Sequence, residues 1–94
     1  MIVYSITCVP TDQIYVGAGG LQRWCGHLGM LRNGKHWIAR LQQVFNRYDE
    51  HEFEFGVLEV CDSNVCSSSW REGYWIERLK TYEPARGFNT HYRW

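Results

Sequence analysis

Two segments rich in β-branched and aromatic residues open the chain, and the short turn between them constrains the fold more than any other feature. Residues 2–9 and residues 13–17 both have the composition of strands. Residues 10–12, Pro-Thr-Asp, are typical of a turn. Because the connection is so short, the two strands are expected to pair as an antiparallel hairpin. The glycines of segment 17–20 predict the end of the second strand.

Apolar residues recur at helical spacing in the middle of the chain. A first helix is expected to begin at Leu21 and to end at Asn33-Gly34, and a second is expected over residues 36–48. Gln42 and Asn46 of the second helix are expected to be ordinary surface polar residues. The apolar faces are predicted to consist of Leu21, Trp24, Leu28 and Leu31 in the first helix and of Ile38, Leu41, Phe45 and Tyr48 in the second.

The rest of the chain completes one small mixed domain. Residues 53–61 are expected to form a third strand, and residues 88–94 a short strand or a wrap across the core. A third helix is expected over residues 68–82, with an apolar row of Trp70, Ile76 and Leu79. The 94 residues fit a single domain, residues 1–94. The order strand–strand–helix–helix–strand–helix predicts an α/β protein of the α+β kind, in which helices flank a small three-stranded antiparallel sheet.

Charge and hydropathy restrict the classes of partner. The chain has 10 Lys and Arg against 10 Asp and Glu, whereas a free-standing, tight DNA binder normally carries a basic surplus. Residues 21–48 contain basic side chains but no carboxylate, which predicts one positive face. No segment is apolar enough to span a bilayer, and the start lacks the features of a signal peptide, so we expect no membrane partner and a cytoplasmic location.

The cysteines are expected to be reduced thiols that pack as small hydrophobes, because no secretion signal precedes them. They are Cys8, Cys25, Cys61 and Cys66, and none forms a closely spaced pair of the kind common in structural zinc sites. A small zinc-binding domain that uses Cys61, Cys66 and a histidine is one alternative.

Three ionisable residues on the predicted helices are candidates for chemistry. Arg23 and His27 lie one helical turn apart, so a guanidinium that grips phosphate would lie beside an imidazole that accepts or relays a proton. Their structural alternative is a solvated helix edge. Glu72 continues the apolar row of the third helix, where a carboxylate needs a partner such as a divalent metal ion or an arginine.

Four further residues have both a functional and a structural interpretation. Tyr4 and Tyr15 lie in the predicted hairpin, where tyrosines usually pack with the hydroxyl at the rim. His36 opens the second helix and is either a helix-start residue or a phosphate contact. Asn89 is either a turn residue or an amide that contacts the site.

The order of these residues is more specific than any one of them. The ordered set resembles the GIY-YIG nuclease superfamily along nearly the whole chain, and the likeness is closest to the catalytic domains of phage homing endonucleases. Two positions depart from the family pattern: Ile2 replaces the glycine of the first motif, and Val16 replaces the isoleucine of the second. The set comprises Ile-Val-Tyr at 2–4, Tyr-Val-Gly at 15–17, Arg23-x-x-x-His27, Gly-Lys-His at 34–36, Leu-Gln at 41–42, Phe-Asn at 45–46, Phe-x-Phe-x-x-Leu-Glu at 53–59, Glu72-x-x-Trp-Ile and Gly-Phe-Asn at 87–89.

The resemblance implies a metal-dependent endonuclease that hydrolyses phosphodiester bonds of DNA. It implies that Glu72 holds the single metal ion, Mg²⁺ or Mn²⁺, and that Arg23 neutralises charge on the phosphate. Tyr4 is then the expected general base, although its ordinary pKa of about 10 is too high for that role without help. The remaining site residues implied by the family pattern are Tyr15, His27, His36 and Asn89.

Several alternatives stay open at the level of sequence. The same fold could hold DNA or a protein partner without cutting. The chain is expected to act as a monomer or weak homodimer in a bacterial or phage-infected cell, nicking DNA with little sequence preference. Whether it is a fragment that works beside a DNA-reading module, or a standalone enzyme, stays open as well.

Overall fold

A three-stranded antiparallel sheet with β1 in its centre organises the fold. A computed structural model describes residues 2–61 and 68–89. The sheet order is β2-β1-β3. In chain order the elements are β1 (Ile2–Cys8), β2 (Gln13–Gly19), α1 (Leu21–Arg32), α2 (Ala39–Tyr48), the 3-10 turn η1 (Glu50–Glu52), β3 (Phe53–Val60) and α3 (Ser68–Leu79). The predicted fold class and the predicted order of the elements are confirmed.

The predicted hairpin of β1 and β2 is confirmed, but β2 is longer than expected. Tyr4 lies opposite Gly17, Ile6 opposite Tyr15, and Ile2 opposite Gly19. The glycines therefore do not end the strand at residue 17. Pairing with the central strand outweighs the low strand propensity of glycine, because tertiary context decides such cases.

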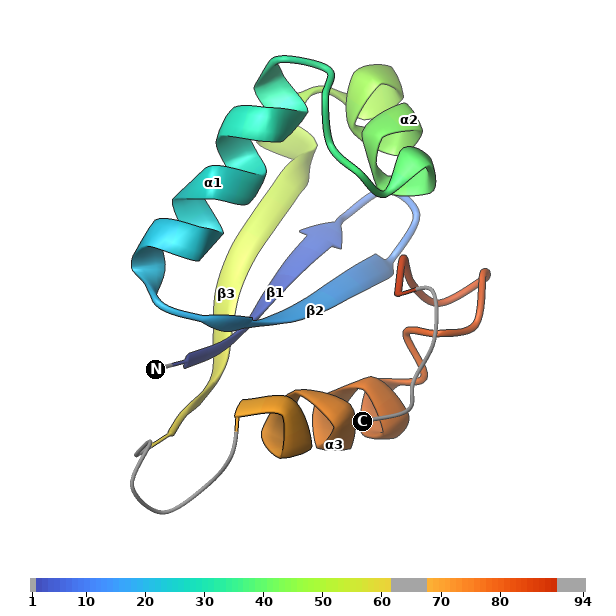
Figure 1. Ribbon diagram of the computed structural model, residues 1–94. Helices are drawn as coiled ribbons and strands as arrows, with labels where there is room; N and C mark the ends of the chain where they lie inside the picture. Colours follow the sequence, from blue (N-terminus) through green and yellow to red (C-terminus); the bar gives the residue numbers. More distant parts are fainter. Residues whose placement is uncertain (1, 62–67, 90–94) are drawn as a thin grey trace.

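The two faces of the sheet carry separate apolar cores, with helices on both sides (Figure 1). Tyr4, Ile6 and Cys8 of β1 face α1 and α2. Val3 of the same strand faces α3, where it packs with Ile76. This alternation follows from the strand geometry, which directs successive side chains to opposite faces.

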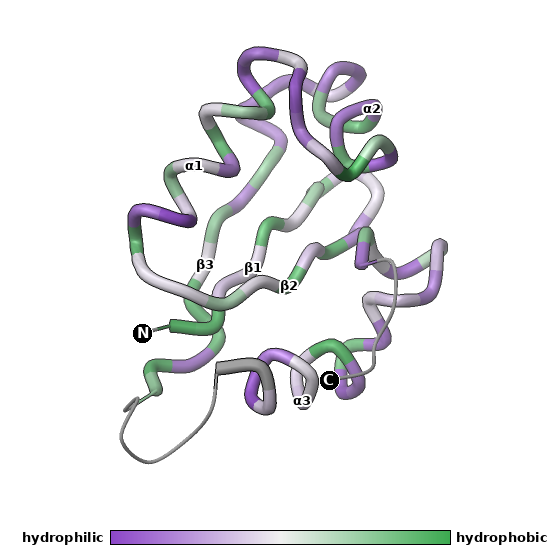
Figure 2. The backbone as a smooth tube through the Cα atoms, viewed as in Figure 1, coloured by the Kyte–Doolittle hydropathy of each residue, from purple (hydrophilic) through white to green (hydrophobic). Residues whose placement is uncertain are grey.

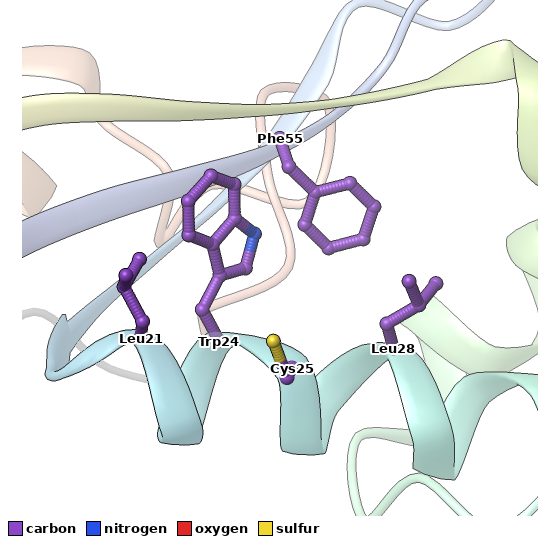
Figure 3. A pocket seen from close by; sticks show the side chains of 5 residues that line it. All are labelled: Leu21, Trp24, Cys25, Leu28 and Phe55. Carbon is purple, nitrogen blue, oxygen red and sulfur yellow. The ribbon is translucent and has the colours of Figure 1, made fainter.

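Helix α1 packs most of its predicted apolar face against the sheet. Leu31 is buried, and Trp24 and Leu28 are partly buried against the same core, whereas Leu21 at the start of the helix is 62% exposed. Leu21, Trp24 and Leu28 also line an open pocket of about 320 Å³ together with Cys25 and Phe55 (Figure 3). The predicted face is therefore confirmed except at Leu21, and the polar His27 is buried beside it.

Helix α2 begins later than predicted, and helix α3 ends earlier. Helix α2 begins at Ala39, not at His36, and its predicted apolar face of Ile38, Leu41 and Phe45 is buried. Helix α3 ends at Leu79, because the following Lys80 has a φ of 56°, outside the helical region. The prediction that Trp70 lies on the buried row is wrong, since its side chain is 50% exposed.

Residues 86–89 extend the sheet along the outer edge of β2. The backbone N–H of Ile14 donates to the carbonyl of Arg86, and the N–H of Phe88 donates to the carbonyl of Ile14, both at 3.0 Å. Phe88 is fully buried in the core beneath α1 and α2. The predicted wrap across the core is therefore confirmed for residues 88–89, while residues 90–94 lie outside the described residues.

Hydrophilic residues gather in the connection between α1 and α2, whereas the strands contain most of the long hydrophobic stretches (Figure 2). In the part of the chain that the structure describes, no helix has both the length and the apolar character needed to cross a bilayer. Cys8 and Cys61 are buried, as predicted for cysteines that pack as small hydrophobes, but Cys25 is exposed. Cys66 lies outside the described residues.

A substitution at Gly26 tests whether this position of α1 is free of packing contacts. It lies in the middle of the helix, and a Cβ atom added there would meet no other atom within 4 Å. We therefore expect Gly26→Ala to raise the free energy of unfolding by about 0.5–1 kcal/mol, because alanine has the higher helix propensity. Urea denaturation followed by circular dichroism measures this change. A destabilised variant would show that α1 packs against something at this position.

Candidate active site

Gly17 allows the ring of Tyr4 to cross edge strand β2. The two residues lie opposite each other in the β1–β2 ladder, and the Tyr4 side chain is fully buried. A Cβ atom at position 17 would lie 2.5 Å from Cζ of Tyr4 and 2.6 Å from its hydroxyl oxygen. Such distances are far below van der Waals contact. The glycine of the Tyr-Val-Gly motif is therefore needed for the observed position of the Tyr4 hydroxyl.

A chain of hydrogen bonds links Tyr4 to two histidines. The hydroxyl oxygen of Tyr4 lies 2.6 Å from Nε2 of His27, and Nδ1 of His27 lies 2.8 Å from Nε2 of His36. The backbone N–H of Ile38 donates to Nδ1 of His36 at 3.0 Å. Strand β1, helix α1 and the connection before α2 each contribute one side chain to this cluster.

The backbone N–H of Ile38 determines which atom is the donor in each of these hydrogen bonds. Because Nδ1 of His36 accepts a hydrogen bond from a backbone N–H, a neutral His36 must carry its proton on Nε2. Nε2 of His36 then donates to Nδ1 of His27, and a neutral His27 carries its proton on Nε2. His27 therefore donates to the hydroxyl oxygen of Tyr4, and the Tyr4 proton is directed away from it.

Burial keeps both histidines neutral. The side chain of His27 is fully buried, and that burial, with smaller contributions from the charges of His36 and Arg23, lowers the pKa of His27 to about 4. Burial also lowers the pKa of His36. The expectation that His27 takes up a proton near neutral pH is therefore not supported by its surroundings, and its observed contribution is an N–H donor.

These lowered pKa values predict a loss of stability in acid. A histidine with a folded-state pKa below its unfolded value of about 6.5 leaves stability unaffected above that pH. Below it, only the unfolded state takes up the proton. We expect the free energy of unfolding to fall by about 1 kcal/mol between pH 7.5 and pH 5.5, and further down to pH 4, because His27 stays neutral until its pKa of about 4.

Urea denaturation at a series of pH values measures this loss, and His27→Gln is the matched variant. Its stability is expected to change less over the same pH range. Equal pH dependence in the two proteins would show that His27 is not the group responsible.

Gln42 holds the connection that carries His36. Its Oε1 accepts from the backbone N–H of His36, and its Nε2 donates to the carbonyl of Leu31 and to Oδ1 of Asn46, over 2.8–3.0 Å. The prediction that Gln42 is a surface polar residue is wrong, because its side chain is buried. It ties the end of α1 and the start of α2 to the segment between them, and so positions His36.

Tyr15 closes the cluster on the side of β2. Its ring centroid lies 5.2 Å from that of His27 and 6.4 Å from that of His36. Burial raises the pKa of Tyr15 well above its usual value of about 10, and the neighbouring Tyr4 and Glu72 raise it further. Tyr15 therefore stays protonated at neutral pH and can only donate or accept hydrogen bonds there.

Arg23 and Glu72 bring opposite charges to the same cluster. Burial is the largest influence on the pKa of Tyr4 and raises it. The charge of Arg23 and a hydrogen bond from it act in the opposite direction, whereas the charge of Glu72 again raises this pKa. Arg23 is exposed and Glu72 is half-buried. A cation and an anion from helices on opposite faces of the sheet thus both act on the Tyr4 hydroxyl.

The six predicted site residues of β1, β2, α1, α3 and the α1–α2 connection are therefore brought together. The interpretation of Arg23 and His27 as a solvated helix edge holds for exposed Arg23 but not for buried His27. The structure does not place His36 in a helix, because the hydrogen bonds of its backbone N–H and its ring belong to an extended connection. The predicted set comprises Tyr4, Tyr15, Arg23, His27, His36 and Glu72.

Asn89 lies one step away from this cluster and holds β2 in place. Its Oδ1 accepts from the backbone N–H of Val16 at 3.0 Å and from the hydroxyl of Thr81 at 2.7 Å, and its Nδ2 donates to the Val16 carbonyl at 3.0 Å. Both lone pairs of Oδ1 are engaged. In this arrangement Asn89 positions the strand between Tyr15 and Gly17, and its oxygen is not available to a metal ion.

Glu72, the predicted metal ligand, is half-buried. Among residues 2–61 and 68–89, no group of three or more His, Cys, Asp or Glu side chains could hold an ion. A site for Mg²⁺ does not need such a group, because Mg²⁺ commonly binds one or two carboxylates and completes its shell with water and phosphate oxygens. The alternative zinc site cannot be assembled from the described residues, because Cys66 lies outside them.

The open pocket beside α1 is a different feature. It shares no residue with the tyrosine–histidine cluster, and apart from the Cys25 thiol its lining is hydrophobic. Such a lining has no group that binds phosphate or a hard metal ion.

Trp37 is a neighbour of the cluster that sequence reasoning missed. Its ring centroid lies 4.3 Å from that of His36 and 4.9 Å from that of His27, and the side chain is 56% exposed. The tryptophan follows His36 directly in the sequence, but nothing in its spacing distinguishes it from a surface residue.

Comparisons with known proteins give a match among solved structures. The catalytic domain of the homing endonuclease I-TevI is 27% identical, with a TM-score of 0.79 over 95% of this chain and 96% of that one. A point mutant of the catalytic domain of the intron endonuclease I-TevI is also 27% identical, with a TM-score of 0.80 over 98% of this chain and 94% of that one. No family model matches the sequence. No curated protein sequence matches either.

Proposed function

Starting from the resemblance to the GIY-YIG nuclease superfamily, which the structural neighbours confirm, we propose that this chain is an endonuclease that hydrolyses phosphodiester bonds of DNA with the help of one divalent metal ion. The similarity to endonuclease catalytic domains supports the endonuclease activity. The metal dependence and the DNA substrate are the parts proposed here.

The observation that supports this proposal most strongly is the convergence of three side chains, from helices α1 and α3, on the hydroxyl of Tyr4. His27 donates to the hydroxyl oxygen of Tyr4, while the charges of Arg23 and Glu72 act on the same group from opposite sides. Stability alone does not require such a cluster. Buried polar groups stabilise a fold only when all their hydrogen-bond partners are in place, and apolar side chains fill a core without that condition.

In the proposed reaction, water attacks phosphorus in line with the leaving 3′ oxygen. The attacking oxygen forms a bond to phosphorus, the P–O3′ bond breaks, and solvent supplies the proton that the 3′ oxygen takes up. Tyr4, in its phenolate form, accepts the proton that the water loses. Arg23 binds the non-bridging oxygens of the phosphate, on which negative charge grows as the reaction proceeds.

Burial raises the pKa of Tyr4 above its usual value, and two contacts act against that rise. The phenolate form of Tyr4 is stabilised by the charge of Arg23 and by the N–H of His27, and hydrogen bonds to a charged form favour that form. His36 keeps His27 in the tautomer that donates, because Ile38 occupies the other nitrogen of His36. His27 and His36 therefore position and polarise Tyr4 and need not carry a proton themselves.

Glu72 would hold the metal ion, Mg²⁺ or Mn²⁺, with one ion per site. When bound, this ion supplies positive charge that stabilises the leaving 3′ oxygen. A single ion serves one strand at a time, so we propose that the chain nicks DNA as a monomer or weak homodimer. A double-strand break then needs two events.

Incubation with supercoiled plasmid tests the proposal. With Mg²⁺ or Mn²⁺ the purified chain is expected to convert the plasmid to the nicked and then the linear form, and with EDTA to leave it intact. Binding to plasmid, hairpin and branched DNA without cleavage, in either metal, would instead identify a binding module that uses the same fold.

A further inference from the structure

Three aromatic rings pack against one another between the interior of the site and the surface. The hydrogen-bonded rings of His27 and His36 lie 5.1 Å apart with an angle of 24° between their planes. The ring of Trp37 packs against both, with its centroid 4.3 Å from that of His36 and 4.9 Å from that of His27, at angles of 18° and 41°. His27 is also hydrogen-bonded to Tyr4.

Trp37 is the accessible member of these three rings. His27 is fully buried and His36 nearly so, whereas Trp37 is 56% exposed. Among the described residues, the ring contacts of Trp37 are those with the two histidines. The indole therefore covers the histidine pair, while more than half of its own surface stays exposed.

The second exposed tryptophan of the described chain provides a comparison. Trp70 is 50% exposed, but the guanidinium of Arg71 lies 4.7 Å from its ring centroid and belongs to a bidentate ion pair with Glu59. The exposure of Trp70 is thus accompanied by a cation–π contact within its own helix. The ring contacts that Trp37 makes with described residues are instead with two residues of the candidate site.

We propose that Trp37 stacks against an unpaired nucleobase of the DNA substrate next to the scissile phosphate, which makes a single-stranded or distorted strand the preferred substrate. The inference rests on the proposed nuclease function of the same site. A base that stacks on the exposed part of the indole would lie next to the histidine that is hydrogen-bonded to Tyr4, so that its phosphate could be bound by Arg23. Aromatic side chains bind unpaired bases in this way irrespective of sequence, because every base has a flat π-face.

The charge of the chain makes such stacking valuable. The formal net charge is zero, so attraction to the phosphate backbone is weak compared with that of a basic DNA-binding domain. Of the cations in segment 21–48, Arg32 pairs with Glu50, and Arg40 donates to the carbonyls of Pro84 and Gly87. A base-stacking contact supplies affinity that does not depend on these cations.

Binding without metal tests this inference separately from cleavage. We would measure, in EDTA, the fluorescence anisotropy of a labelled single strand of about 15 nucleotides, a blunt duplex of the same length, and a strand with the same backbone but abasic sites. The proteins compared are wild type, Trp37→Ala, Trp37→Phe, Trp37→Leu and the matched control Trp70→Ala. Circular dichroism confirms that each variant is folded.

The single strand is expected to bind wild type, Trp37→Phe and Trp70→Ala within about twofold of one another, and Trp37→Ala about tenfold more weakly. Trp37→Leu keeps the apolar cover over His36 but has no π-face, so it should bind like Trp37→Ala. Wild type should bind the duplex and the abasic strand as weakly as Trp37→Ala binds the normal strand.

Three results would overturn the inference: equal binding of Trp37→Ala and wild type, wild-type binding by Trp37→Leu, or no preference for strands that carry unpaired bases. The binding results do not depend on the proposed function. A wild-type chain that shows this pattern but does not cut in Mg²⁺ would refute the nuclease proposal alone, and a chain that cuts without this pattern would refute the stacking proposal alone.

Discussion

Replacement of Glu72 by glutamine, or of Arg23 by alanine, is expected to lower the rate of DNA cleavage by about 1000-fold or more while the fold remains intact. Glutamine keeps the size of the side chain but removes the charge that a divalent ion requires. Alanine at position 23 removes the cation that acts on Tyr4 and, in the proposed reaction, on the phosphate. Arg23 is exposed, so its truncation leaves no buried cavity.

Single-turnover cleavage of an end-labelled DNA in saturating Mg²⁺ measures both effects. The matched controls are Glu77→Gln, which changes an exposed carboxylate of the same helix as Glu72, and Gln22→Ala, which changes the exposed neighbour of Arg23. Both controls should cut at the wild-type rate. Arg23→Lys keeps the charge but not the paired donors, and an intermediate rate is expected. Wild-type rates for Glu72→Gln and Arg23→Ala would remove both residues from the site.

Gly17→Ala is expected to give the second largest effect, because it acts on the position of Tyr4. The added Cβ atom would lie 2.5–2.6 Å from the ring and hydroxyl of a fully buried side chain, so the ring has to move. Overpacking of this kind lowers the free energy of unfolding by about 1–3 kcal/mol. Displacement of a reactive group by about 1 Å can lower the rate by about 100-fold.

Urea denaturation and single-turnover cleavage together separate the two consequences of Gly17→Ala. Below the denaturation midpoint the variant is folded, and its rate should still be about 100-fold lower. Gly26→Ala is the control, since a Cβ atom there meets no other atom within 4 Å. A Gly17→Ala protein that cuts like wild type would mean that the observed position of the Tyr4 hydroxyl does not matter for the reaction.

The secondary structure was largely predictable because its signals are local. The β-branched residues of β1, the turn at residues 10–12 and the glycine that follows α1 each act on their own segment of chain. The length of β2 was not predictable in the same way. Gly17 and Gly19 remain in the strand only because β1 provides partners for them, and pairing between strands is a tertiary property.

Whether a site residue is buried depends on how the helices and strands pack. The spacing of apolar residues along the sequence predicts this packing poorly. The apolar row of α1 predicts that Leu21 faces the core, yet Leu21 is exposed while the polar His27 is buried with hydrogen bonds to Tyr4 and His36. Gln42 resembles any surface glutamine in a helix. It is buried because its side chain makes hydrogen bonds with the backbone of His36 and of Leu31. The spacing of residues in the sequence does not predict such hydrogen bonds.

The candidate site residues could be predicted from their order along the chain, whereas the contacts around them could not. Order alone places Tyr4, Arg23 and Glu72 together without stating how they meet. The tautomer of His27, the passage of Tyr4 over Gly17 and the packing of Trp37 against two histidines follow only from distances in the folded chain.

The most direct test of the central claim is to nick a plasmid and then determine which chemical groups the cut leaves at the two ends. Supercoiled plasmid is treated with the purified chain and Mg²⁺, and the nicked product is then incubated with DNA ligase. In-line attack that breaks the P–O3′ bond leaves a 5′ phosphate and a 3′ hydroxyl, so ligase should reseal the nicks. Intact plasmid in Mg²⁺ and in Mn²⁺, or nicks that ligase cannot reseal, would contradict the proposed hydrolysis.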